Sequence, residues 1–157
     1  MFERLFVGRE INLNNFMRVV FDTNIFISMF IWRNKELEFL YNLFWQNKIT
    51  VAVNPQIIQE MTRVLDYPKF AVPLLKADLT AEKIIKAVLN DCLFFSSSTK
   101  PPKVIKDDPS DNIILDCALA SGADFIVSGD KHLLNLKSFQ NIPILAPRQF
   151  INRFKKI

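Results

Sequence analysis

The chain has 157 residues, half of them hydrophobic, and a formal net charge of +4 at pH 7. This length suits one domain with a substantial core, and so apolar a composition excludes a disordered chain. Two separated cysteines, one histidine and three glycines exclude a zinc site of the usual Cys/His kind and a glycine-rich phosphate loop.

Residues 1–16 precede the first predicted strand. They lack the long apolar core and the small-residue cleavage site of a secretory signal. No other stretch approaches the ~20 apolar residues that a membrane span needs. We therefore expect a cytoplasmic protein without membrane contact, composed of one domain at 17–157 and a leader at 1–16 whose place in the native protein is open.

In the first half of the chain, short apolar runs alternate with segments of helical period. The pattern predicts strands at 18–22 and 50–54, a helix at 35–47, a helix that begins at Pro55, short helices within 68–90 and a further strand at 91–96. Proline is well tolerated in the first turn of a helix, which supports the start at Pro55.

The second half repeats this alternation after a polar, proline-rich loop. A helix is predicted between Asp108 and Gly122, because an acid and a proline favour its start and the glycine favours its end. Strands at 124–130 and 142–145, a short helix at 132–136 and a terminal helix at 147–154 follow. Strands separated by helices predict a parallel sheet with helices on both faces.

Acidic side chains end two of the predicted strands. Asp22 ends the first strand, and Asp130 follows the apolar run FIVSG. Ligands of an open parallel sheet bind at the carboxyl ends of its strands. The two carboxylates are therefore expected to reach one edge of the sheet.

Two helices add further acids. On the helix from Pro55, Glu60 lies at ~300° when Ile57 is set at 0°, on the flank of the buried stripe, whereas Arg63 at ~240° is expected to face away. Asp111 lies in the first turn of a helix that is apolar almost all round, which is typical of an internal helix. Asp116 lies ~140° from Asp111 on that helix, so the two do not easily serve one metal.

Each acid also has a purely structural explanation. Asp22 would cap a helix that begins at Thr23 or Asn24, Glu60 would pair with a surface cation, Asp111 would be the capping-box partner of Asp108, and Asp130 would close a turn with Gly129. We favour a shared site, because otherwise all four explanations have to hold at once. Crowded carboxylates repel one another unless a cation intervenes, and oxygen ligands without His or Cys select Mg²⁺ or Mn²⁺.

Three stretches resemble the PIN domain family of metal-dependent ribonucleases, over residues from about 17 to 151. VVFDTNIFIS is similar to the opening strand of the family, NPQIIQEMTRVL to the helix that bears its glutamate, and DPSDNIILDCALASGADFIVSGDKHLL to the subgroup of putative toxins of toxin–antitoxin pairs. The resemblance implies a three-layer α/β/α sandwich with a central parallel sheet. It also implies hydrolysis of single-stranded RNA by metal-activated water, an RNA substrate, a cognate antitoxin as partner, and a homodimer.

Carried over by position, the resemblance implies four metal-binding catalytic acids: Asp22, Glu60, Asp111 and Asp130. Asn24 and Ser128 match polar positions that orient carboxylates or substrate. Asp116 matches a position that is often acidic in the subgroup, without an assigned role.

Two other functions compete with this reading. A phosphatase of the haloacid dehalogenase type also begins with an acid at a strand end, but its D-x-D pair would need an acid where this chain has Asn24. A non-catalytic nucleic-acid-binding protein on a PIN scaffold would use the basic tail for backbone phosphates. The presence of all four acids argues against such a decayed site.

Overall fold

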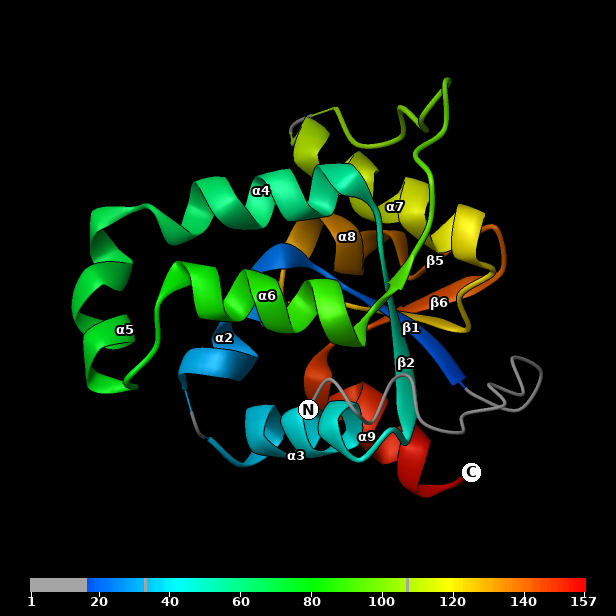
Figure 1. Cartoon of the computed structure of the whole chain (residues 1–157). Coiled ribbons are helices and arrows are strands. Elements are labelled where there is room, and N and C mark those ends of the chain that lie inside the picture. The colour runs from blue at the N-terminus through cyan, green and yellow to red at the C-terminus, as the bar shows by residue number, and fades with distance from the viewer. Residues whose placement is uncertain (1–16, 33, 107) are drawn as a thin grey trace.

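The computed structural model describes residues 17–32, 34–106 and 108–157, so the expected leader at 1–16 lies outside the described residues. In this part of the chain, helices cover both faces of a central sheet (Figure 1). The strands are β1 (Met17–Phe21), β2 (Ile49–Val53), β3 (Leu93–Phe94), β4 (Phe125–Val127), β5 (Ser138–Phe139) and β6 (Ile142–Leu145). The α/β/α three-layer architecture with a mostly parallel sheet is as predicted.

The helices fall between these strands. They are α2 (Thr23–Ile31), α3 (Lys35–Trp45), α4 (Pro55–Leu65), the 3₁₀ turn η1 (Pro68–Phe70), α5 (Ala71–Lys76), α6 (Ala81–Asp91), α7 (Pro109–Ser121), α8 (Lys131–Leu136) and α9 (Pro147–Lys155). None of these helices is long and apolar enough to cross a membrane.

The strand order is β3-β2-β1-β4-β6-β5, so the sheet has a topological switch point between β1 and β4. From β1 the chain first builds outward through β2 to β3, and it later adds β4 and β6 on the other side, all in parallel. Such a reversal leaves a crevice beyond the carboxyl ends of the central strands, where open α/β sheets bind ligands. Here those strands are β1 and β4.

The edge strand β5 was not predicted from the sequence. It pairs antiparallel with β6 through a tight turn at Gln140 and Asn141, both of which have positive φ angles. Two-residue hairpin turns of this kind suit the twist of the strands that they join. A strand of two residues offers too short a pattern for periodicity to detect.

The core lies on both sides of the sheet. The central strands are buried on both faces, with Val19, Val20, Ile126 and Val127 each 0% exposed. Helix α7 contacts β1, β2 and β4, and α4 packs beside it, while α3 and α9 pack together on the other face (Figure 1). The apolar face of α3 packs into this core through four buried residues: Leu37, Leu40, Leu43 and Phe44.

A buried asparagine fixes α4 relative to α7. Asn54 is 1% exposed and caps α4, because its side-chain oxygen accepts a hydrogen bond from Ile57 N at 2.9 Å. Its amide nitrogen donates to the carbonyl of Ile113 in α7 at 3.4 Å. The helix that carries Glu60 is therefore held beside the helix that carries Asp111.

Candidate metal centre

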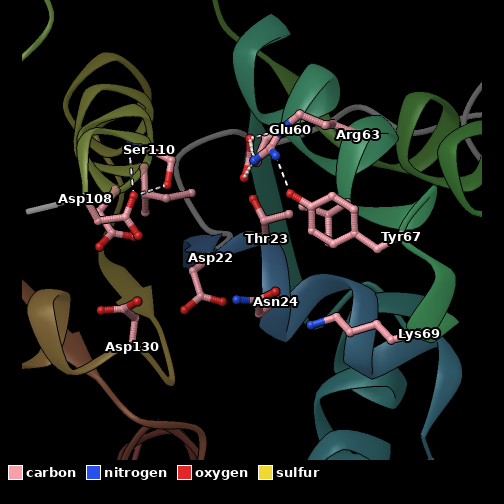
Figure 2. A pocket seen from close by; sticks show the side chains of 13 residues that line it. Asp22, Thr23, Asn24, Glu60, Arg63, Tyr67, Lys69, Asp108, Ser110 and Asp130 are labelled. Carbon is pink, nitrogen blue, oxygen red and sulfur yellow. Dashed lines mark hydrogen bonds and ion pairs between the residues drawn. The ribbon is translucent and has the colours of Figure 1, made fainter.

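A cavity of about 290 Å³ opens at the carboxyl ends of β1 and β4. Figure 2 shows acidic side chains from several elements around it. The four acids predicted from the sequence all line this cavity, together with a fifth that was not predicted: Asp22, Glu60, Asp108, Asp111 and Asp130. Segments that are far apart in sequence thus bring their carboxylates together around one cavity.

Asp22 follows β1 and is held by both of its carboxylate oxygens. It is 5% exposed; Oδ1 accepts from Ile25 N at 2.7 Å and so caps α2. Oδ2 accepts from the hydroxyl of Ser128 and from Gly129 N, the latter at 3.1 Å. Burial raises the pKa of Asp22, these hydrogen bonds lower it in part, and the charge of Asp130 raises it further.

Asp130 lies at the start of α8, three residues after β4 ends. Its Oδ1 accepts from His132 N at 2.7 Å and caps that helix. Its own backbone N–H donates to the Ser128 oxygen at 2.9 Å. The fully buried Ser128 hydroxyl therefore bridges Asp22 and the backbone of Asp130.

Asp108 is the N-cap of α7, where its Oδ1 accepts from the backbone and the hydroxyl of Ser110. One ligand oxygen each of Asp108, Asp111 and Asp130 lies within 4.8 Å of the others. Neither Asp22 nor Glu60 belongs to this group of three. The acidic pair in DDPSD was a visible signal for Asp108, but helix capping already accounted for it.

Asp111 has the most unfavourable environment of the acids. It is 7% exposed, and its Oδ2 is buried without a hydrogen-bond partner among the residues that the structure describes. The pKa of Asp111 is raised to about 7, first by burial and then by the negative charges of Asp108, Asp130, Asp22 and Glu60, in that order. A buried carboxylate without a partner is costly, and a bound cation would offset that cost.

Glu60 is paired with a cation of its own helix. Arg63 donates from Nη2 to both carboxylate oxygens, at 2.7 and 2.8 Å, and from Nε to Oε2 at 3.2 Å. The expectation that Arg63 faces away was wrong, because residues three apart are neighbours on a helix surface and the long side chain bends back. Both residues line the cavity.

The remaining predicted residues lie in different places. Asn24 is exposed and lines the cavity beside Asp22 (Figure 2). Asp116, in contrast, lines another surface hollow, and its Oδ2 accepts from Ser98 N at 3.0 Å. It therefore anchors the loop before α7 and does not join the acids of the cavity.

The structural and functional explanations of these acids turn out to be compatible. Asp22, Asp108 and Asp130 each cap a helix with one oxygen while lining the cavity. Helices of a parallel sheet begin at the carboxyl edge of the strands, so their N-caps gather there. The residues present fit a hard divalent cation: three clustered carboxylates and one buried oxygen without a partner.

Comparison with known proteins places the chain among related sequences. Residues 18–132 match the model of a family described as PIN domain. The uncharacterized protein MJ1680 of Methanocaldococcus jannaschii is 27% identical over 153 residues, covering 89% of this chain and 93% of that protein.

Two solved structures share the fold. One is VapBC2 from Rickettsia felis, bound to a DNA fragment from its own promoter. It has a TM-score of 0.56 and 15% sequence identity, and the match covers 82% of this chain and 97% of that one. PAE2754 from Pyrobaculum aerophilum has a TM-score of 0.53 and 13% identity, covering 96% of this chain and 100% of that one.

Proposed function

The chain belongs to the PIN domain family, and on that premise we propose that it is a Mg²⁺- or Mn²⁺-dependent endoribonuclease that hydrolyses single-stranded RNA. The observation that carries the proposal is the trio Asp108, Asp111 and Asp130. One oxygen of each lies within 4.8 Å of the others, and Oδ2 of Asp111 is buried without a hydrogen-bond partner among the described residues. Such a group of oxygens suits a hard divalent cation and leaves room for phosphate oxygens from a substrate.

The trio and Asp22 would hold the ion, and Glu60 would add a fifth carboxylate to the same cavity. When bound, a divalent cation supplies an activated water and neutralises charge on the phosphoryl oxygens. The protein's own part is to keep the carboxylates in place before substrate arrives. Ser128 and the backbone of Gly129 orient Asp22, and the helix caps orient Asp108 and Asp130.

Asn24 is proposed as a substrate contact. Its side chain is exposed in the first turn of α2 and lines the cavity near Asp22. An amide can donate to a phosphate oxygen or accept from a ribose hydroxyl. Substitution of Asn24 by Ala should therefore raise KM more than it lowers kcat.

The test is cleavage of a mixed set of single-stranded RNAs by the purified full chain in Mg²⁺ or Mn²⁺, with chelated samples as blanks. Asp111→Asn should abolish cutting, whereas Asp116→Asn, outside the cavity, should retain it. RNA binding without cutting across varied RNAs and both metals would instead favour a non-catalytic scaffold. Equal cutting by the Asp111 variant would refute the metal-centre mechanism.

The resemblance to the toxin subgroup extends the proposal to a role as the toxin of a toxin–antitoxin pair, with a small antitoxin protein and a second copy of the chain as partners. A gene for a small protein next to this one would support that role. Co-expression of the two should yield a complex in which RNA cleavage is suppressed. If the protein encoded by the neighbouring gene leaves RNA cleavage unchanged, the toxin role is refuted, whereas the proposed nuclease activity is not affected.

A further inference from the structure

The wall of the cavity opposite the aspartates carries cations and an aromatic ring. Arg63 lies at the end of α4, Tyr67 follows that helix, and Lys69 lies in η1. All three line the cavity. Figure 2 shows them on one side of it, with Asp108 and Asp130 on the other. We call this set of three residues the basic wall.

Arg63 and Tyr67 form a joined unit. Arg63 donates from Nη1 to the Tyr67 hydroxyl, and its guanidinium carbon lies 5.5 Å from the centroid of the Tyr67 ring. The Arg63 side chain is 59% exposed and Tyr67 is 36% exposed. The guanidinium therefore lies at the hydroxyl edge of the ring, and the partly exposed ring is a surface on which a flat partner can stack.

Lys69 supplies a charge that the described part of the chain does not neutralise with an acidic partner. It is exposed and makes no ion pair with any residue in the described ranges. Its ammonium lies 5.1 Å from the centroid of the Phe70 ring, and Figure 2 shows it directed toward Asn24. A cation so placed can contact an anion that enters the cavity mouth.

Neutralisation of Glu60 explains only part of the basic wall. It accounts for the hydrogen bonds from Arg63 to Glu60, but not for Lys69, and not for the partly exposed Tyr67 ring beside them. A ligand that alternates negative charge with flat, apolar faces would use all three side chains. Single-stranded nucleic acid has this character, because its phosphates attract cations and its bases stack on aromatic rings.

We propose that the basic wall binds the nucleotide next to the cleaved phosphodiester, with Tyr67 stacked on its base and Arg63 and Lys69 in contact with its phosphate. This inference rests on the proposed ribonuclease function and places the substrate within the same cavity. A base inside a duplex has no free face for Tyr67, so the wall selects single strands. Stacking is tolerant of base identity, so it selects no particular sequence.

The test is direct binding of a fluorescein-labelled oligouridylate of about 12 nucleotides, followed by anisotropy in Mg²⁺. The full chain carries Asp111→Asn in these measurements to prevent cutting. In that background Tyr67→Ala should weaken binding about fivefold to a hundredfold, as expected for the loss of one stacked base. Tyr67→Phe, which retains the ring, should stay within about twofold of the parent.

The contribution of charge is tested by salt dependence. Lys69→Gln should weaken binding and reduce the slope of log affinity against log salt by about 0.7, the value for one phosphate contact on a single strand. Matched controls lie outside the cavity: Lys48→Gln removes an exposed cation before β2, and Phe94→Ala removes an aromatic ring that is 44% exposed. Both controls should bind as the parent does.

The outcomes separate this inference from the proposed function. If the unmutated chain cuts RNA while Tyr67→Ala and Lys69→Gln bind like the parent, the basic wall is refuted and the nuclease stands. If the unmutated chain cuts nothing but both variants weaken binding, single-strand binding by the basic wall is supported and the proposed RNA cleavage is refuted. Equal affinity for a duplex of the same length would also refute the wall.

Discussion

The hydroxyl of Ser128 donates to Oδ2 of Asp22, although 106 residues separate the two in sequence. This contact joins the end of β1 to the residues that follow β4, across the point where the order of the sheet reverses. Ser128 is fully buried, so water cannot replace the hydroxyl. The orientation of Asp22 therefore depends on a side chain of the neighbouring strand segment.

Replacement of Ser128 by Ala should loosen this arrangement. We expect the metal-free protein to lose about 1–3 kcal/mol of unfolding free energy at pH 8, the usual effect of removing a hydrogen bond to a charged group. Affinity for Mn²⁺ should fall about tenfold or more, as is common when a residue that orients a ligand is removed. Urea unfolding and calorimetric titration measure the two effects.

Ser121 offers a matched control, because it is also buried but donates to the Ala118 carbonyl within α7. Ser121→Ala should cost some stability and leave Mn²⁺ affinity unchanged. An equal loss of affinity in both serine variants would show that the effect arises from general loosening of the fold.

The contribution of Asp111 to the stability of the metal-free protein should fall as the pH rises through the acidic range. The pKa of Asp111 is about 7 in the folded protein against an ordinary 3.8, so folding favours its protonated form. Its stabilising contribution is complete below about pH 4, decreases between about pH 4 and 7, and is constant above. Asp111→Asn should remove the Asp111 part of this decrease, leaving the part that arises from the raised pKa of Asp22, and stabilise the metal-free protein at pH 8 by up to about 4 kcal/mol.

Urea unfolding in a chelator at about pH 4.5, 6 and 8 measures this dependence. Asp116→Asn is the comparison, because that carboxylate is buried in the same helix but binds the loop at Ser98. It shows the effect of amidation at a buried position of α7 that does not line the cavity. A difference in unfolding free energy between the parent and Asp111→Asn that stays constant from about pH 4.5 to 8 would contradict the raised pKa.

Metal binding should release protons near neutral pH. About half of the Asp111 carboxyls are protonated at pH 7, and a metal ligand has to be deprotonated. Titration calorimetry with Mg²⁺ or Mn²⁺ in buffers of different ionisation enthalpy should therefore show release of about half a proton per ion from Asp111 at pH 7, and little release at pH 9. The same heat in every buffer at pH 7 would exclude Asp111 as the titrating ligand.

Two aspartates of the α7 region should respond differently to amidation. Asp108→Asn retains the Oδ1 acceptor that caps α7 but removes a charge from the trio, so its Mn²⁺ affinity should fall at least about tenfold. Asp116→Asn should bind Mn²⁺ as the parent does. Thermal melting with and without metal checks both, because a ligand that binds only the folded state raises the melting temperature.

The sequence indicated the parallel sheet and the strands whose ends carry Asp22 and Asp130, because hydrophobic runs and their polar ends are local patterns. It did not indicate that Asp108 joins the trio, since capping of α7 was a sufficient local explanation. Nor did it indicate the direction of Arg63, since the angular position of a Cα does not fix a long side chain. What was missed depends on contacts between elements, which no local pattern contains.

The isolated oxygen of Asp111 also bears on how such a protein evolves. A substitution that removes this charge is expected to make the chain more robust as it destroys the ion site. Selection for folding stability alone would therefore replace this carboxylate over evolutionary time. If homologous chains keep it, selection for metal binding has outweighed its cost to folding. Inactive variants that remain well folded should also be easy to recover from random libraries.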